Sequence, residues 1–414
     1  MQRILIVEDN KTLAKLIAKK IAAELSYEVD VAYNLSEAKL FLKKYNYFIT
    51  LLDLNLPDAP HGEIVDYVLK TNNRAIVLSA NIDKEFRKKM LQKNIIDYVN
   101  KSGVNDVNYI IQTIKRLQKN QDHTILVVDD SLVFRKQMQN MLENMFYRVI
   151  TVAHGEEALG MLQSNPNISL VITDYNMPVI NGLDLVIEIR KTYAKSDLGI
   201  IALSSNNDDE ITALFLKNGA NDYIKKPFTK EEFSCRINNS IEALENIHII
   251  TNQAKRDFLT GLYNRKYFYA DMKKYFQHAL HEMEPFVLAT LDIDNFKSIN
   301  EKYGQESGDA VITHLADILR ANTNPEDLIA RFSAQEFWIA FKNTSANEAL
   351  ETLEKIRHTL SEAKAYSNKN EPIAYTISIG VLLSPEESLE ESLNQADMLL
   401  FNAKQNGKNQ LLHN

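Results

Sequence analysis

The chain has 414 residues, 45% of them hydrophobic, and a formal net charge of −8. This length predicts about three domains, each with enough apolar residues for its own core. The acidic balance argues against a nucleic-acid partner, and the single cysteine, Cys235, excludes disulfides and a cysteine-based metal cluster within the chain.

The first residues leave no room for a signal peptide, because a core strand begins at Arg3. No apolar run approaches the roughly 20 residues of a membrane span. We therefore expect a cytoplasmic protein with no membrane partner, in a reducing compartment. We expect Cys235 to be a buried helix residue.

Residues 1–119 alternate short β-branched runs with longer segments of helical periodicity, such as 11–25. This alternation predicts βα units on a parallel sheet. Glu8, Asp9 and Asp53 follow or end apolar runs, so they fall at the carboxyl ends of strands, where parallel sheets bind ligands.

The same pattern returns in residues 122–247. ILIVED at 4–9 recurs as ILVVDD at 125–130, and Asp53 recurs at the same spacing as Asp174. Ser79 and Lys101 recur as Ser204 and Lys226 at a slightly larger spacing, so a short length change falls between. Two copies of one domain are the simplest interpretation.

Both copies resemble response-regulator receiver domains, which implies two flavodoxin-like (CheY-like), doubly wound α/β folds. Phosphoryl transfer to a carboxylate needs Mg²⁺, a cation on the phosphoryl oxygen and a hydroxyl that registers its arrival. In the first copy, the resemblance assigns the metal to Glu8, Asp9, Asp53 and the Asn55 carbonyl, the phosphoryl group to Asp53, and the other roles to Lys101, Ser79 and the switch aromatic Tyr98. In the second, the corresponding residues are Asp129, Asp130, Asp174 and Asn176 for the metal, Asp174 as acceptor, Lys226, Ser204 and Tyr223.

The first copy departs from the family in two places. Gly62 lies one residue further from its proline than Gly182 does in the second copy. Lys101 is followed by Ser102, whereas Lys226 is followed by Pro227, where a cis bond is common. The first receiver is therefore expected to be phosphorylated less readily, or to serve mainly as an adaptor for dimerisation.

Residues 231–256 contain almost no helix breakers and are predicted to form one long helix, of which 235–256 connects the second receiver to the last domain. Its apolar residues recur at spacings of three and four: Ile237, Ile241, Leu244, Ile247 and Ile250. This stripe either covers the second receiver's sheet or carries dimerisation to the last domain. Different halves of the helix can do each.

Residues 255–414 contain three segments of one signature: DFLTGLYNR at 257–265, DIDNFKSIN at 292–300 and SAQEF at 333–337, the last between apolar runs that predict a β-hairpin. They resemble the GGDEF family of diguanylate cyclases, which implies an α+β fold like the palm of nucleotidyl cyclases. The family's hairpin tip is Gly-Gly-(Asp/Glu)-Glu-Phe, so the signature is degenerate.

The substitutions at the tip predict a loss of chemistry. Ser333 and Ala334 add Cβ atoms where two glycines would allow positive φ, a geometry that costs other residues about 1–2 kcal/mol. Gln335 is uncharged, so it is a weak Mg²⁺ ligand and cannot accept a proton. Loss of a positioned general base alone lowers rates by about 10² to 10⁴.

Much of the family's site remains. The resemblance assigns Mg²⁺ to Asp292, the Ile293 carbonyl and Glu336, guanine to Asn300 and Asp309, and phosphates to Lys297, Lys404 and Lys408. The alternative is that these are inherited surface residues without a task. The family's inhibitory Arg-x-x-Asp window reads NPED at 324–327, so without its arginine we do not expect cyclic di-GMP to bind there.

The domain order is similar to that of PleD-type response regulators, and the degenerate signature also resembles that of bile-response regulators. We expect a sensor histidine kinase or phosphotransfer protein to phosphorylate the receivers, a homodimer to form, and an inactive output domain to bind GTP or a partner protein. One alternative is a working, slow diguanylate cyclase that makes cyclic di-GMP from two GTP. Another is a phosphate sink that needs only Asp53 and Asp174.

Overall fold

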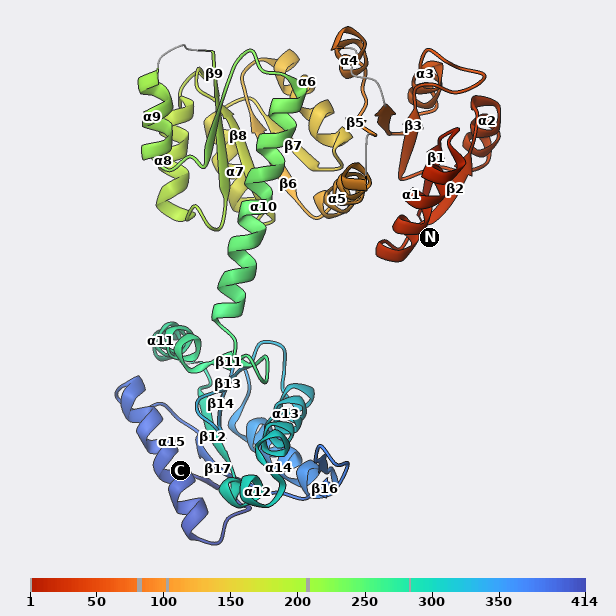
Figure 1. Ribbon diagram of the computed structural model, residues 1–414. Helices are drawn as coiled ribbons and strands as arrows, with labels where there is room; N and C mark the ends of the chain where they lie inside the picture. The colour runs from red at the N-terminus through yellow and green to blue at the C-terminus, as the bar shows by residue number, and fades with distance from the viewer. Residues whose placement is uncertain (1, 80–83, 102–103, 206–208, 283) are drawn as a thin grey trace. The chain divides into compact units, whose positions relative to one another are not determined.

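The computed structural model describes residues 2–79, 84–101, 104–205, 209–282 and 284–414. The chain divides into two compact units, Met1–His248 and Ile249–Asn414 (Figure 1). Ser102, one of the two departures of the first copy, lies outside the described residues.

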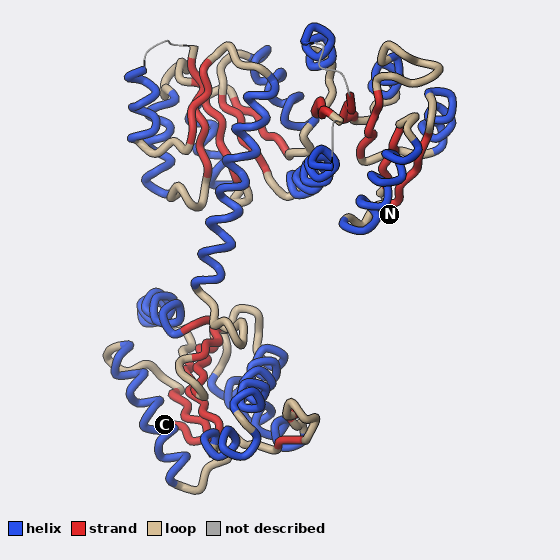
Figure 2. Tube along the Cα trace, in the orientation of Figure 1, coloured by secondary structure: helices blue, strands red, loops and turns tan. Residues whose placement is uncertain are grey.

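The first receiver is a five-stranded parallel sheet in the order β2-β1-β3-β4-β5, with helices on both faces (Figure 2). The central strands β1, β3 and β4 are almost wholly buried, as expected of apolar runs covered on both faces. The strands are β1 (Arg3–Val7), β2 (Glu28–Ala32), β3 (Ile49–Asp53), β4 (Ala75–Ser79) and β5 (Asp97–Asn100). The helices are α1 (Lys11–Glu24), α2 (Leu35–Lys44), α3 (Glu63–Lys70), α4 (Lys84–Leu91) and α5 (Val104–Asn120).

The second receiver repeats this winding in the order β10-β9-β8-β6-β7, again with all strands parallel. Its strands are β6 (Thr124–Val128), β7 (Arg148–Val152), β8 (Ile168–Asp174), β9 (Gly199–Ser204) and β10 (Asp222–Lys225). Its helices are α6 (Leu132–Asn144), α7 (Gly155–Ser164), α8 (Gly182–Thr192), α9 (Asp209–Lys217) and α10 (Lys230–Ala254). The predicted flavodoxin-like fold is confirmed for both copies.

The two receivers share one apolar core, to which both sheets contribute. Phe48 of the first receiver stacks on Phe146 of the second, with ring centroids 4.4 Å apart. Arg116 on α5 forms a two-pronged ion pair with Glu245 on α10, at 2.8 Å for each nitrogen–oxygen contact. His123, between the receivers, hydrogen-bonds the same carboxylate at 2.8 Å. The first receiver is therefore fixed to α10 as well as to the second receiver's sheet.

The apolar stripe of helix α10 is buried in its first part and exposed in its second part. Ile237, Ile241 and Leu244 are buried, whereas Ile247 and Ile250 are exposed by 38% and 65%. Cys235 is exposed, so the expectation of a buried residue was wrong. It precedes Ile237 by two residues and therefore lies about 200° from it around the helix.

The second unit is built on a mixed six-stranded sheet in the order β11-β13-β14-β12-β17-β18. The strands of this sheet are β11 (Tyr263–Asn264), β12 (Val287–Ile293), β13 (Leu328–Arg331), β14 (Glu336–Phe341), β17 (Ile377–Leu382) and β18 (Leu411–His413). A small ribbon pairs β15 (Ala365–Tyr366) with β16 (Pro372–Ile373). The helices are α11 (Arg265–Glu282), α12 (Phe296–Tyr303), α13 (Gln305–Asn322), α14 (Ala346–Glu362) and α15 (Leu389–Gln405).

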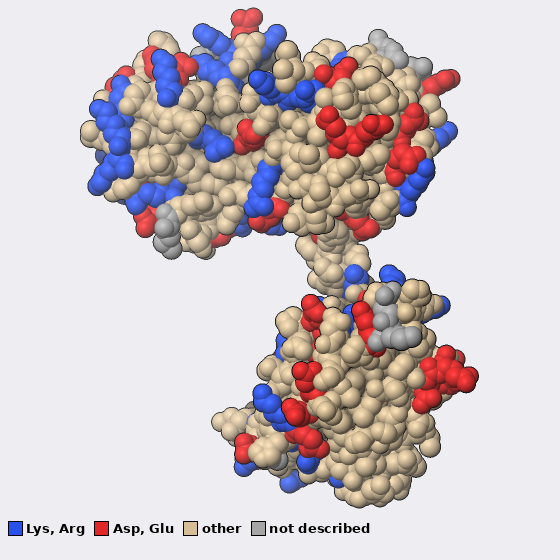
Figure 3. All heavy atoms as spheres, turned by 180° about the vertical axis from the view of Figure 1, so that it is seen from behind, with Lys and Arg blue, Asp and Glu red and all other residues tan. Residues whose placement is uncertain are grey.

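Among the helices that the structure describes, none combines the length and the apolar character that a membrane crossing requires. Figure 3 shows acidic and basic side chains interspersed over the visible face.

Candidate functional sites: two receiver clusters and a degenerate hairpin

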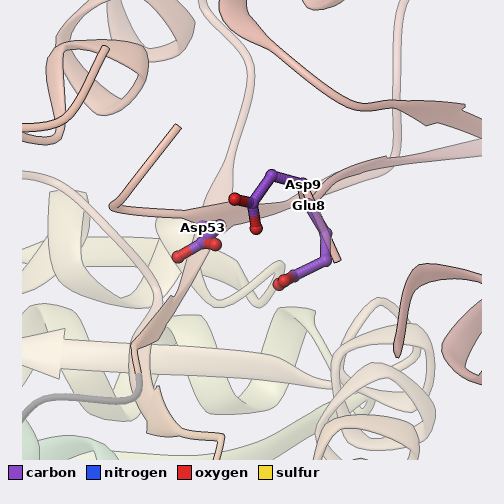
Figure 4. Close-up of side chains that lie close together, drawn as sticks. All are labelled: Glu8, Asp9 and Asp53. Atoms are coloured by element: carbon purple, nitrogen blue, oxygen red, sulfur yellow. The ribbon is translucent and has the colours of Figure 1, made fainter. Parts of the chain in front are cut away.

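In the first receiver, Glu8 and Asp9 follow β1 and Asp53 ends β3. These strands are parallel neighbours, so their carboxyl ends share one edge of the sheet. One carboxylate oxygen of each residue lies within 4.8 Å of the others (Figure 4). Glu8 and Asp53 are buried and Asp9 is exposed. Three carboxylates in this arrangement are a ligand set that suits Mg²⁺.

Lys101 supplies a positive charge to this cluster. Its Nζ lies 2.9 Å from Glu8 and 2.6 Å from Asp53. Burial raises the pKa of Glu8, and the charge of Asp53 adds to that rise. Burial acts to lower the pKa of Lys101, but its contacts with Asp53 and Glu8 raise it on balance. The cluster therefore contains three carboxylates, two of them in contact with the Lys101 ammonium, and this excess of negative charge favours a further cation.

Other predicted members of the first cluster surround it. The Asn55 backbone amide donates to Asp53 Oδ1 at 3.2 Å, which places the predicted carbonyl ligand beside the acceptor. Ser79, at the end of β4, is 4% exposed, and Tyr98 on β5 is 9% exposed. The hydroxyl predicted to register phosphorylation is thus buried at the end of β4, and the aromatic ring is buried on the neighbouring strand β5, in register with Val77.

The second receiver brings the matching residues together. Lys226 Nζ lies 3.0 Å from Asp129 and 2.7 Å from Asp174. Burial raises the pKa of Asp174, against the opposing hydrogen bond from Lys226. The Asn176 amide donates to Asp174 at 2.9 Å.

The remaining members of the second cluster occupy positions like those of the first. Asp130 is exposed and Ser204 is fully buried. Tyr223 is half-buried, and its hydroxyl finds no hydrogen-bond partner within the described part of the chain. The Lys226–Pro227 bond is cis.

The loops that follow the two acceptors differ for a physical reason. A Cβ on Gly182 would lie 2.1 Å from the Asp174 carbonyl oxygen, so only glycine fits there. In the first receiver, Gly62 adopts φ of 76° before α3. In this longer loop, Asp58 accepts hydrogen bonds from the amides at the start of α2, at 2.7 Å from Leu35 and 2.9 Å from Ser36. These bonds join the loop to α2.

In the output domain, Asp292 on β12 pairs in register with Glu336 on β14, so the two acids lie side by side as the sequence predicts. Gln335, however, donates its side-chain amide to both oxygens of Asp292, at 3.0 and 3.1 Å. Lys404 Nζ lies 3.0 Å from the same carboxylate. The Ile293 amide donates to the Gln335 carbonyl, which holds the hairpin tip against the end of β12.

Glu336 is engaged by its own hairpin. It accepts a hydrogen bond from Trp338 Nε1 at 2.7 Å and one from Ser333 Oγ at 3.3 Å. Burial raises the pKa of Asp292, and the charge of Glu336 adds to that rise. The two acids therefore lie close, but each is already hydrogen-bonded within the protein.

The tip keeps a compact form without glycine. Arg331 donates to the carbonyl oxygens of Ser333 and Ala334 and pairs with Asp257 at 3.1 Å. Neither Ser333 nor Ala334 adopts a positive φ. The tip therefore uses a turn that ordinary residues allow, different from the one two glycines permit.

The predicted guanine residues lie on adjoining helices. Asn300 on α12 has a buried Oδ1 without a partner in the described ranges, and Asp309 on α13 is half-buried. A Cβ on Gly308 would lie 1.8 Å from that Oδ1, so a larger residue at 308 would displace the Asn300 side chain. An unpartnered buried acceptor next to a carboxylate suits a ligand that donates hydrogen bonds.

The predicted phosphate lysines are not gathered around one point. Lys297 is 91% exposed and lies 3.9 Å from Glu301. Lys404 pairs with Asp292, and Lys408 donates to the Asn295 side chain.

No role was predicted from the sequence for three acids of this domain. Two of them stabilise the fold through hydrogen bonds, and the third has a raised pKa. Asp294 accepts hydrogen bonds from Thr376 and Ser378, both at 2.7 Å, and joins β12 to β17. Asp327, the last residue of the NPED window, accepts the Lys342 amide at 3.0 Å and is likewise structural. Partial desolvation and the charge of Glu336 raise the pKa of Asp397 on α15 to about 6. The alternating acids of residues 292–294 are the signal that could have marked Asp294.

Comparisons with known proteins fit this geometry. The model for the response regulator receiver domain matches residues 4–115 and 125–238, and that for the diguanylate cyclase, GGDEF domain, matches residues 254–410. Response regulator PleD of Caulobacter vibrioides is 25% identical over 450 residues, which cover 98% of each chain. Diguanylate cyclase DosC of Shigella sonnei is 31% identical over 156 residues, 37% of this chain and 34% of its own.

A crystal structure described as a two-component system response regulator/GGDEF domain protein is 37% identical, with a TM-score of 0.53 over 59% of this chain and all of its own. None of these relatives bears on the resemblance to bile-response regulators, which stays a prediction. The receiver model covers more than half of the chain, and the domain order is that of PleD. The chain belongs to the response regulators, and its output domain is a GGDEF domain related to diguanylate cyclases.

Proposed function

We propose that a histidine kinase or a phosphotransfer protein phosphorylates Asp174 and Asp53, that the phosphorylated chains dimerise, and that the GGDEF domain binds GTP without converting it to cyclic di-GMP. The receiver half of this proposal is supported by two buried acceptors at equivalent strand ends, each held by a lysine. A carboxylate oxygen of the acceptor attacks the phosphorus of the donor's phosphohistidine, the phosphorus–nitrogen bond breaks with its electron pair leaving on the histidine nitrogen, and the lysine then contacts a phosphoryl oxygen.

The acid cluster of the first receiver fits Mg²⁺, with Glu8, Asp9 and Asp53 as the carboxylates that would hold it. In the second receiver the corresponding carboxylates are Asp129, Asp130 and Asp174, whose oxygens do not converge to the same degree. When bound, Mg²⁺ would neutralise the charge of the incoming phosphoryl group. Ser79 and Ser204, buried at the neighbouring strand ends, are placed to donate to the new phosphoryl group.

One observation carries the output half. The Gln335 amide donates to both oxygens of Asp292, the carboxylate expected to bind metal. Lys404 binds the same group, and Gln335 offers no negative charge and no basic oxygen with which to deprotonate a 3′-hydroxyl. Metal binding at Asp292 would first have to break these contacts.

Nucleotide binding is supported by the predicted guanine residues, which have the residue types that the family uses. Asn300 and Asp309 provide an unpartnered acceptor and a carboxylate, which match the N–H donors on the edge of guanine. Wild-type protein is expected to bind GTP measurably by calorimetry, and Asn300→Ala together with Asp309→Ala to abolish the signal. Equal heats for wild type and the double variant would contradict a guanine site.

Dimerisation is supported by the last turns of α10. Ile247, Ile249 and Ile250 are exposed by 38%, 50% and 65%, and three isoleucines so close together are costly to leave in water. Beryllofluoride, which mimics an aspartyl phosphate, should shift the protein from monomer to dimer in sedimentation velocity. Unchanged sedimentation would contradict phosphorylation-driven dimerisation.

A weak diguanylate cyclase is the second candidate function. The observation in its favour is the register of Asp292 and Glu336, which could bind one metal ion between them if Gln335 rotated away. Assay of cyclic di-GMP separates the two candidates directly.

A further inference from the structure

The first receiver contains a cavity of about 310 Å³ between α1 and α5. Most of its walls are apolar: Leu13, Leu16, Ile17, Leu78, Val107 and Ile110. Lys101, which contacts Asp53 and Glu8, also lines it. Sites for small molecules begin at about this volume and are mostly apolar with a few polar groups.

In the second receiver, phenylalanine side chains occupy the positions that correspond to this cavity. Leu13 and Phe134 are both the third residue of their helices, α1 and α6, after capping residues at matched positions. Val107 and Phe233 are both the fourth residue of α5 and α10. The sequence has Gly103 where the second copy has Phe228. Counted from the start of each helix, smaller residues thus stand where Phe134 and Phe233 lie in the second receiver, while Gly103 lies outside the described residues.

Those three phenylalanines pack against one another. The rings of Phe134 and Phe228 meet edge to face at 5.9 Å, and Phe228 stacks on Phe233 at 5.3 Å. Lys226 Nζ lies 3.8 Å from the centre of the Phe134 ring. In the second receiver an aromatic ring therefore lies against the lysine that corresponds to Lys101, a favourable cation–π arrangement.

We propose that the cavity of the first receiver binds a small, uncharged aromatic molecule whose ring lies against Lys101, as the Phe134 ring lies against Lys226. An anion is disfavoured because Glu8, Asp9 and Asp53 already outnumber Lys101. A strongly charged molecule would also lose hydration against the leucine and isoleucine walls. Because Lys101 contacts both the cavity and the phosphoryl acceptor, binding and phosphorylation of Asp53 are coupled.

Indole is a suitable probe, because it is aromatic, uncharged and small. Methyl-labelled full-length protein should show saturable shifts of the Ile17 and Ile110 methyl resonances on titration with indole. The methyl resonances of Ile237 and Ile241, buried in the second receiver, should not move. An absence of shifts at Ile17 and Ile110 up to the solubility limit of indole would overturn the proposal.

Two substitutions test the comparison between the copies. Leu13→Phe should fill the cavity and abolish the indole shifts, while Leu40→Phe, the same change at an exposed position of α2, should leave them intact. Persistence of the shifts in folded Leu13→Phe protein would place the ligand elsewhere and overturn the site. Phe134→Leu should conversely create indole-dependent shifts around Lys226.

Coupling is measured in Asp174→Asn protein, which leaves Asp53 as the only acceptor of the two. Indole should change the rate of phosphoryl incorporation from acetyl phosphate on the order of fivefold, a typical coupling between linked sites. The same titration in Asp174→Asn, Leu13→Phe protein should leave the rate unchanged. Equal indole effects in both proteins would overturn the coupling.

Discussion

Asp53 and Asp292 are both buried aspartates at the carboxyl end of a strand, yet their surroundings differ. Lys101 is shared between Asp53 and Glu8, with Asp9 beside them, so negative charge is in excess. Asp292 lies beside Glu336, but its own oxygens accept hydrogen bonds from the Gln335 amide and pair with Lys404. Position on the sheet therefore does not make a metal site; at Asp292 an amide stands where the first receiver has converging carboxylates.

Removal of the acceptors should produce the largest effects. Asp174→Asn should eliminate phosphoryl incorporation in the second receiver, because an amide is a very poor nucleophile for phosphorus. Asp53→Asn should remove a smaller share, because the loop after Asp53 departs from the family pattern and is hydrogen-bonded to α2. Phosphate-affinity gels of protein treated with acetyl phosphate measure both. Asp53→Asn, Asp174→Asn protein is the control, and labelling of that double variant would show a third acceptor.

Restoring the family's residues at the hairpin tip should make the site around Asp292 catalytic. Ser333→Gly, Ala334→Gly and Gln335→Glu together should raise cyclic di-GMP production about 10²-fold or more above wild type, because a positioned base and a flexible tip return. Mass spectrometry of the product after incubation with GTP and Mg²⁺ provides the measurement. The same triple variant with Asp292→Ala should stay inactive. A triple variant without activity would mean that the wider pocket has also changed.

Glu245 shows what complete pairing does to a carboxylate. Burial acts to raise its pKa, but Arg116 and His123 lower the pKa to about 2. Its folded-state pKa is below the ordinary 4.5, so its contribution to stability is present above about pH 4.5 and is lost as pH falls toward 2.

Glu245→Gln should therefore reduce the unfolding free energy of the first unit by about 2 kcal/mol at pH 7, and by about half of that at pH 3. Urea denaturation at the two pH values measures the difference. Glu242→Gln, an exposed position on the same helix, is the matched control and should change little. An equal loss at both pH values would contradict the ion-pair explanation.

The smallest effect is spectroscopic. Trp338 is the only tryptophan, and its Nε1 binds Glu336 beside Asp292, so its fluorescence reports on the signature site alone. Gln335→Glu should make that emission respond to Mg²⁺ by roughly a tenth, because a carboxylate then replaces the amide that contacts Asp292. Wild type and the uncharged Gln335→Met should not respond. A Mg²⁺ response in wild type would show that Asp292 and Glu336 already bind metal.

The sequence was sufficient to predict the ends of the strands, because an apolar run followed by an acid defines a strand end within a few residues. Asp53, Asp174 and Asp292 were placed in this way, and each lies at the end of a buried strand. The contact between Gln335 and Asp292 could not be predicted, since it depends on the side-chain torsions of a glutamine in a turn that the family does not use. The exposure of Cys235 depends on which face of α10 the receiver covers, and local composition does not specify that face.

The sequence pattern also did not reveal that the first receiver has smaller residues where the second has phenylalanines. Leu13 and Phe134 are both apolar, so the two copies appear equivalent until their volumes are compared in three dimensions.

We propose that the receivers accept phosphoryl groups while the output domain makes no cyclic di-GMP. The most direct test is to incubate purified protein with GTP, Mg²⁺ and beryllofluoride and to assay cyclic di-GMP by mass spectrometry, with Asp292→Ala protein as the control. We expect a beryllofluoride-dependent dimer and no product in either sample. Product in wild type that disappears in Asp292→Ala protein would contradict this proposal, because Asp292 and Glu336 would then suffice for catalysis.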